Sequence, residues 1–114
     1  MAATTIDAAT FMALQEATGR EFAGELVGTF LEEAPLMLRE LGAALAAHDA
    51  EKFRRSAHSL KSNSLTFGAL RLGAMARELE LGGFDRAAGA GDPLAALAAE
   101  YVRVATALEE LRDA

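Results

Sequence analysis

The residues with the clearest capacity for chemistry are His58 and Lys61, which are three positions apart in a segment with helical periodicity. At about 100° per residue, one side of that helix collects its apolar and small residues, Phe53, Ala57, Leu60, Ser64 and Phe67. His58 lies roughly 150° from the middle of this stripe, so we expect its imidazole to face water. A neutral imidazole is a nucleophile that needs no general base. An ammonium group at i+3 can offset negative charge on a group that the ring carries. The pair predicts a phosphoryl carrier.

Further residues share the outer face with His58 and are candidates for partner docking. Ser62, at i+4, is small enough to let another surface approach the imidazole. Leu65 is an apolar residue expected to face water, as a docking contact does. Arg54 and Arg55 either attract an acidic partner surface or only keep the helix solvated, and the sequence favours neither interpretation.

Composition excludes several classes of function. The 114 residues suffice for one domain, residues 1–114, and 52% of them are hydrophobic, with alanine and leucine, both good helix formers, prominent. The net charge of −6 argues against nucleic acid or an anionic membrane as the main partner. The chain has no cysteine, which excludes disulfides and thiolate chemistry. No apolar run is long enough to span a membrane, and the N-terminus lacks the pattern of a signal peptide. We expect a cytoplasmic monomer.

The elements that must position His58 are helices with short connections. Asp7 is a predicted N-cap of a first helix that ends near Gly19, and a second helical stretch runs from about Arg20 to Ala47. Within it, Pro35 marks either a kink or a stop and restart. We predict Asp49 as the N-cap of the helix that carries His58.

The second half of the chain continues this pattern. Gly68 is the predicted end of the His58 helix, and the next helix fades at Gly82–Gly83. Residues 83–92 are predicted to form a loop, and Asp92–Pro93 starts the last helix. The stripe Phe22, Leu26 and Phe30 is predicted to be core. Short connections between amphipathic helices favour an antiparallel up-down bundle.

The segment Ala57–Ser64, with Gly68–Ala69 behind it, resembles the histidine-containing phosphotransfer (HPt) family, whose pattern is A-H-x-L-K-G-x-S-x-x-x-G-A. Ser62 departs from it, because the family often has glycine there. The resemblance extends to Phe30–Pro35 and to Arg77–Glu80, and so covers nearly the whole chain.

The resemblance implies an all-α fold, an antiparallel up-down four-helix bundle with an additional short N-terminal helix. It implies that His58 accepts a phosphoryl group from the aspartate of a receiver domain and passes it to another receiver, reversibly, with Lys61 beside the phosphohistidine. The implied partners are response-regulator receiver domains and a cognate hybrid histidine kinase. Such a domain is a carrier rather than an enzyme and needs no cofactor or metal, since Mg²⁺ belongs to the receiver.

Three other functions are alternatives. The dimerisation domain of a histidine kinase usually has an acidic residue after its histidine and then a proline, whereas Ser59 follows His58 here. The phosphoacceptor domain of a chemotaxis-type kinase has a similar motif and is charged by an ATP-binding module. An adaptor that binds receivers without carrying phosphate is the third. A free-standing protein and an excised domain of a hybrid kinase are both compatible with the sequence.

Other polar residues are expected to be structural. His48, in the turn before Asp49, is predicted to be exposed near the last carbonyls of the preceding helix. Glu78 and Glu80 are expected to pair weakly with nearby arginines at the surface.

Overall fold

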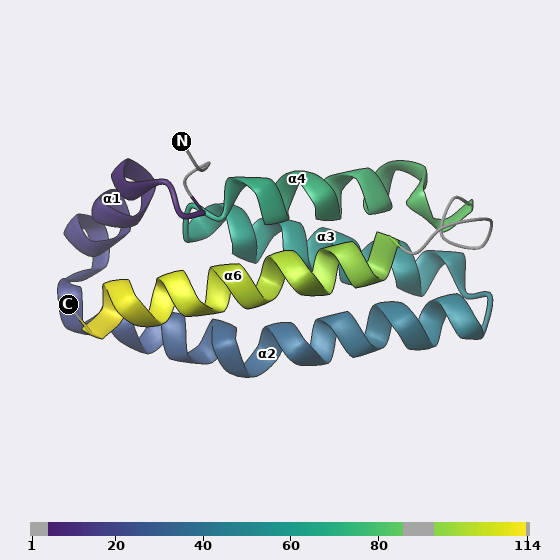
Figure 1. The fold of residues 1–114 in the computed structure, drawn as a ribbon, viewed down its shortest axis with the longest axis horizontal. Helices are drawn as coiled ribbons and strands as arrows, with labels where there is room; N and C mark the ends of the chain where they lie inside the picture. Colours follow the sequence, from purple (N-terminus) through teal and green to yellow (C-terminus); the bar gives the residue numbers. More distant parts are fainter. Residues whose placement is uncertain (1–4, 86–92, 114) are drawn as a thin grey trace.

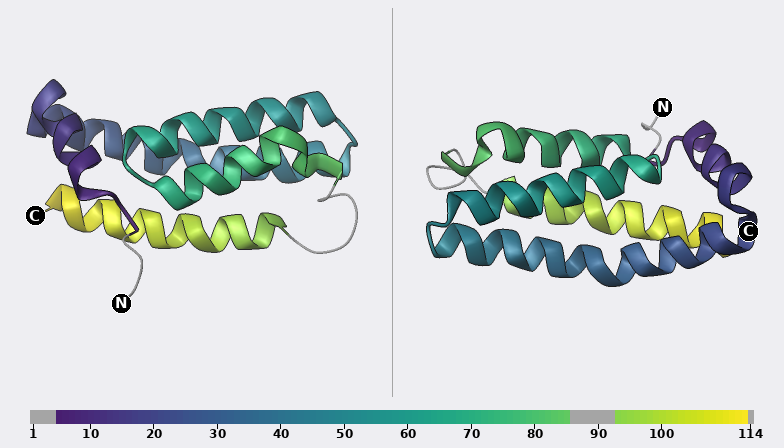
Figure 2. Two further views of the ribbon diagram at one scale, coloured as in Figure 1. Left: turned by 90° about the horizontal axis from the view of Figure 1, so that it is seen from above. Right: turned by 180° about the vertical axis from the view of Figure 1, so that it is seen from behind.

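The computed structural model describes residues 5–85 and 93–113, and these residues are all-helical. They form five α-helices and a π-helical turn: α1 (Ala8–Thr18), α2 (Arg20–Ala46), α3 (Ala50–Thr66), α4 (Leu70–Glu78), η1 (Leu79–Gly83) and α6 (Pro93–Asp113). The four segments α2, α3, α4 and α6 lie side by side along the long axis, and α1 lies at one end of them (Figures 1 and 2). Helix α3, which carries His58, packs against both α2 and α4.

The predicted caps place the start and the end of α3. The side chain of Asp49 accepts a hydrogen bond from the backbone N–H of Lys52 at 3.0 Å. At the other end Gly68 has a φ of +83°, a conformation that favours glycine. Its carbonyl also accepts a hydrogen bond from the N–H of Asp7 at 2.8 Å, so the same turn anchors the segment that leads into α1. Asp7 is itself the N-cap of α1, as predicted.

Helix α2 continues through Pro35 without stopping. Proline has no N–H, so the carbonyl of Leu31, four residues earlier, loses its helical donor. The hydroxyl of Tyr101 in α6 donates a hydrogen bond to this carbonyl at 3.3 Å. Burial raises the pKa of this phenol, with a further contribution from Glu109, so the group stays protonated and able to donate. A side chain from a neighbouring helix therefore satisfies a group that the proline leaves unpaired.

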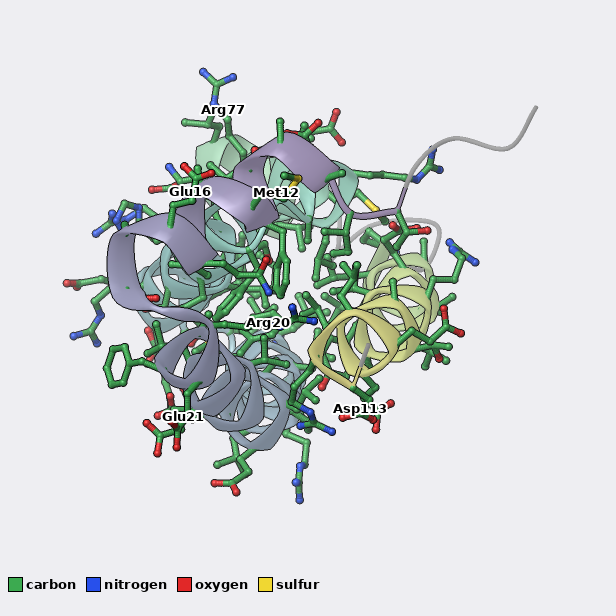
Figure 3. The ribbon with its side chains drawn as sticks, turned by 90° about the vertical axis from the view of Figure 1, so that its left-hand side faces the viewer. Met12, Glu16, Arg20, Glu21, Arg77 and Asp113 are labelled. Atoms are coloured by element: carbon green, nitrogen blue, oxygen red, sulfur yellow. The ribbon has the colours of Figure 1, made fainter. Side chains whose placement is uncertain are left out.

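The core lies where the inner faces of the long helices meet, and an end-on view shows their side chains converging there (Figure 3). All five residues of the predicted α3 stripe are buried: Phe53, Ala57, Leu60, Ser64 and Phe67. The prediction for Phe22 is wrong, because its side chain is 50% exposed while Phe30 is buried. A spacing of four drifts by about 40° per step around a helix, so two steps carry Phe22 off the buried face.

A buried carboxylate ties α6 to the start of α4. Glu100 is 2% exposed, and its Oε1 lies 2.7 Å from Nη2 of Arg103 and 3.5 Å from Nε of Arg71. Two cations around one carboxylate keep it from being a buried unpaired charge. Because α4 leads directly into η1, this contact helps to fix the segment that faces His58.

The α4 helix ends in the π-helical turn η1 rather than fading out. Gly82 inside this turn has a φ of +144°, which side-chain-bearing residues rarely adopt. Residues 86–92, most of the predicted loop and including the predicted N-cap Asp92, lie outside the described residues. Pro93 is the first residue of α6, as predicted. None of the helices in the described part of the chain combines the length and apolarity that a membrane span requires.

Candidate functional site

His58 stands on the outer face of α3, opposite the buried stripe, as its spacing predicts. Its side chain is 55% exposed. Its neighbours in sequence, Ala57 and Leu60, are buried and hold this face of the helix toward the core. The imidazole is therefore carried by a rigid, well-packed element, and half of its surface is open to solvent.

The imidazole is not isolated, because a carboxylate from η1 reaches it. Oε2 of Glu80 lies 2.6 Å from Nδ1 of His58, and Oε1 of the same carboxylate lies 2.8 Å from Nζ of Lys61. The Glu80 side chain is 12% exposed, so this bridge lies against the protein surface rather than in open water. The three side chains form one cluster, which we call the His–Lys–Glu site.

The charges of the site favour an ionised Glu80. The hydrogen bond from Lys61 lowers the pKa of the Glu80 carboxyl below its ordinary value of 4.5. Desolvation opposes this shift, and the hydrogen bond and charge of His58 add to it. At neutral pH Glu80 is therefore a carboxylate that can only accept hydrogen bonds.

The candidate docking residues are found on the same outer face. Arg54, Arg55 and Ser62 are exposed. Arg55 also borders a groove of about 600 Å³ between α2 and α3, which is lined by Glu33, Leu36, Met37, Glu40, Lys52, Arg55, Ser56 and Ser59. The groove reaches the immediate neighbour of the imidazole, since Ser59 follows His58 in the chain.

Leu65 is 42% exposed and leans against the start of α4. A Cβ atom at position 73 would lie 2.6 Å from Cδ2 of Leu65, so the absence of a side chain at Gly73 leaves room for this leucine. Leu65 is thus an apolar side chain at the surface, as predicted, and its position depends on Gly73.

The chain is similar to known proteins. It matches the family model described as Hpt domain over residues 25–114. The chain belongs to the HPt family.

Its fold is also similar to a solved structure, the crystal structure of histidine-containing phosphotransfer protein B (HptB) from Pseudomonas aeruginosa PAO1. The two share 30% sequence identity with a TM-score of 0.86, and the match covers 98% of this chain and 97% of that chain. A search of curated proteins gave no match. The likeness therefore extends over nearly the full length of both HPt chains.

Within this HPt domain, Glu80 is the site residue that the sequence did not predict. Its expected partner was an arginine, but its partners are His58 and Lys61. Arg77 is the arginine closest to Glu80 in the sequence, and its side chain points away from the bundle (Figure 3). The sequence does contain one signal, a carboxylate two residues before the Gly82–Gly83 pair, placed where the helix that packs on α3 ends.

His48 is the second histidine of the chain. His48 is exposed in the turn after α2, with a φ of +57°, and its N–H donates to the carbonyl of Leu45 at 3.2 Å. In the described ranges, no three histidine, aspartate or glutamate side chains are grouped so as to hold a metal ion.

Proposed function

We propose that His58 is the phosphoacceptor of a two-component phosphorelay. In this proposal it takes a phosphoryl group from a receiver-domain aspartate and passes it to the aspartate of another receiver, and the transfer is reversible. The observation that carries the proposal is a half-exposed imidazole beside Lys61 on α3 of a chain that belongs to the HPt family. The similarity to HptB, which is named a histidine-containing phosphotransfer protein, supports it.

The proposed transfer requires only a nucleophile and a nearby cation from this chain. A neutral imidazole attacks phosphorus directly, so no general base is needed. Lys61 is 22% exposed and close enough to the ring to meet a phosphoryl group on it. Its ammonium would offset the added negative charge. The receiver would supply the aspartate and the Mg²⁺, so we assign this domain the role of a phosphoryl carrier rather than an enzyme, with no cofactor of its own.

The receiver must reach the imidazole, and we propose that it docks on the outer face of α3. Ser62 leaves the approach open, Arg54 and Arg55 attract acidic groups, and Leu65 gives an apolar contact. The groove between α2 and α3 adjoins this face at Ser59. Its exposed Leu36, 51% accessible, extends the apolar part of the surface.

Membership of the HPt family also supports proposals about the bundle topology and the partners. We propose an antiparallel up-down four-helix bundle with a short additional N-terminal helix, formed by residues 1–114 as one domain. Its proposed partners are receiver domains and a cognate histidine kinase. The most direct way to identify them is to measure phosphoryl transfer between this protein and each receiver of the source organism. We further propose that it acts as a cytoplasmic monomer.

The two histidines of the chain allow a matched test. A receiver domain labelled with radioactive phosphate is incubated with the wild-type protein, with His58→Gln and with His48→Gln. We expect base-stable, acid-labile label on the wild type and on His48→Gln, and none on His58→Gln. Each variant loses one exposed imidazole, so general effects of the substitution cancel. Label that survives in His58→Gln would show that another residue is the acceptor.

The same experiment separates the alternatives. A receiver-binding adaptor predicts no label on any variant, together with receiver binding that His58→Gln leaves unchanged. The phosphoacceptor domain of a chemotaxis-type kinase predicts label from ATP and a separate kinase module without any receiver. Incubation with labelled ATP and candidate kinases, with and without a receiver, distinguishes this arrangement from transfer by a receiver.

A further inference from the structure

We propose that Arg54 is a second phosphoryl-binding cation of the site, and that its guanidinium binds the oxygens of a phosphoryl group on His58 together with Lys61. This inference rests on the proposed function, because it concerns the same phosphorylated imidazole. It adds to the docking role of Arg54 a direct contact with the transferred group.

Arg54 belongs to a row of α3 side chains on the side of the helix that faces α4 and η1. The row is spaced by four, three and four residues, which keeps its members on one face: Arg54, His58, Lys61 and Leu65. His58 and Lys61 both contact Glu80 of η1. Leu65 leans against the start of α4. Arg54 is the first member of the row, one turn before His58.

Packing at the start of α3 places Arg54 beside the end of η1. Phe53, its neighbour in the sequence, packs edge-on against Phe84, with the ring centroids 5.5 Å apart. Phe84 directly follows η1. Side chains of a helix lean toward its N-terminus, so the imidazole of His58 lies over the turn that Arg54 begins. The Cβ atoms of residues four apart are about 5 to 6 Å from each other, a distance that an arginine side chain spans.

The charges already present at the site do not suffice for a phosphoryl group. Nζ of Lys61 and Oε1 of Glu80 lie 2.8 Å apart, so the formal charges of this pair cancel. A phosphoryl group on a side chain adds a charge of about −1.5 to −2 near neutral pH. On His58 that charge would lie beside the Glu80 carboxylate, and Lys61 alone cannot offset both anions. A second cation is needed next to the ring.

Arg54 is available for this role. Its side chain is exposed, and among residues 5–85 and 93–113 no hydrogen bond or ion pair holds its guanidinium. Arg55 is also exposed, but it is turned by about 100° around the helix and lines the groove between α2 and α3. A guanidinium can donate two parallel N–H bonds to phosphate oxygens, which an ammonium cannot.

The test uses phosphoramidate, a small phosphoryl donor, so that no receiver has to dock. The lone pair of an imidazole nitrogen of His58 forms a bond to phosphorus, the P–N bond of phosphoramidate breaks, and its electron pair leaves with the nitrogen as ammonia. The ³¹P chemical shift of the phosphorylated protein is then followed against pH. This titration gives the midpoint pH at which the phosphoryl group gains its second negative charge.

A guanidinium bound to the phosphoryl oxygens favours the dianion and therefore lowers this midpoint. We expect Arg54→Gln to raise the midpoint by about 0.5 pH, which is about a threefold smaller ionisation constant, because solvent partly screens an exposed cation. Arg54→Lys keeps the charge without the two parallel donors and should restore part of the difference. Arg39→Gln removes the same charge from an exposed arginine of α2 and should leave the midpoint unchanged.

Three results would overturn the inference. The first is an equal midpoint in the wild type and in Arg54→Gln. The second is an equal rise in Arg54→Gln and Arg39→Gln, which would assign the effect to net charge alone. The third is a His58 that phosphoramidate leaves unmodified, because an accessible imidazole beside two cations should accept phosphate from a small anionic donor.

The outcomes separate this inference from the proposed function. If a phosphorylated receiver fails to label His58 while the midpoint of the phosphoramidate product depends on Arg54, the phosphorelay role fails and the phosphoryl-binding role stands. If a receiver labels His58 while the midpoint ignores Arg54, the phosphorelay role stands and the inference fails.

Discussion

Nζ of Lys61 lies 2.8 Å from Oε1 of Glu80, across the gap between α3 and η1. The lysine that would serve the phosphoryl group is therefore already paired with an anion of its own chain. A phosphoryl group on His58 would be a second anion beside the same ammonium. Lys61 is thus held by the same carboxylate that contacts the His58 ring.

Lys61→Ala is expected to shorten the lifetime of phosphohistidine and to slow transfer from a receiver, each by about 3- to 30-fold. We expect a smaller loss of rate than removal of a buried oxyanion-hole donor causes. The reason is that the Lys61 side chain is 22% exposed, so solvent partly screens its charge. The measurement is the decay of phosphoramidate-labelled protein, followed by transfer from a labelled receiver. Lys52→Ala removes the other lysine of α3, which is exposed, and should leave the decay unchanged. Wild-type decay in Lys61→Ala would show that the ammonium is incidental.

The depressed pKa of Glu80 predicts how stability depends on acid pH. Its folded-state pKa is lower than the ordinary value of 4.5, chiefly through Lys61, so the folded state holds the carboxylate ionised where the unfolded chain would protonate it. The stabilisation is fully present above the unfolded pKa and is lost as pH falls through the lower, folded pKa. The wild type should therefore lose its advantage in free energy of unfolding over Glu80→Gln as the pH falls from above 4.5 through the lower, folded-state pKa.

Urea unfolding at several pH values across this range measures that difference. Glu78→Gln is the control, and its difference from the wild type should stay flat. If the wild type instead gained free energy of unfolding relative to Glu80→Gln as the pH falls, the ionised carboxylate would destabilise the fold. That result would contradict the ion pair with Lys61 as a source of stability.

Local rules predicted the helix that carries the site. The period of α3 placed Phe53 and Leu60 in the core and His58 on the outside, and Asp49 caps the helix as expected. These features depend on residues within one or two turns, where helical geometry leaves few alternatives. The start of α6 at Pro93 was predictable for the same reason.

Features that depend on contacts between elements were not predictable in this way. Glu80 reaches His58 only because α4 packs along α3 and ends in a π-helical turn at Gly82, which a periodic pattern does not encode. Similarly, the sequence left open whether α2 stops at Pro35. It continues, and its unpaired Leu31 carbonyl finds a donor in Tyr101, a residue of another helix.

Gly73 and Leu65 are expected to be coupled. Replacing glycine with alanine inside a helix ordinarily stabilises by about 1 kcal/mol. Here the new Cβ would lie 2.6 Å from Cδ2 of Leu65, so the leucine must move and part of that gain is lost. Gly73→Ala should therefore stabilise by about 1 kcal/mol in a Leu65→Ala background and by at least about 0.5 kcal/mol less in the wild type. Denaturant titrations of the four proteins measure the coupling, and equal effects in both backgrounds would show that the two side chains do not compete for space.

The contact between Tyr101 and the Leu31 carbonyl predicts a second coupling, which involves Pro35. Tyr101→Phe removes the hydroxyl that donates to this carbonyl at 3.3 Å and should destabilise the protein by about 1 kcal/mol. In a Pro35→Ala background the new backbone N–H can bond to the same carbonyl, since it lies four residues further along α2. The cost of Tyr101→Phe should then fall to about 0.5 kcal/mol or less. Urea unfolding of the four proteins of this cycle gives both costs. An equal cost in both backgrounds would mean that the hydroxyl stabilises the fold by some route other than serving the carbonyl that the proline leaves without a donor.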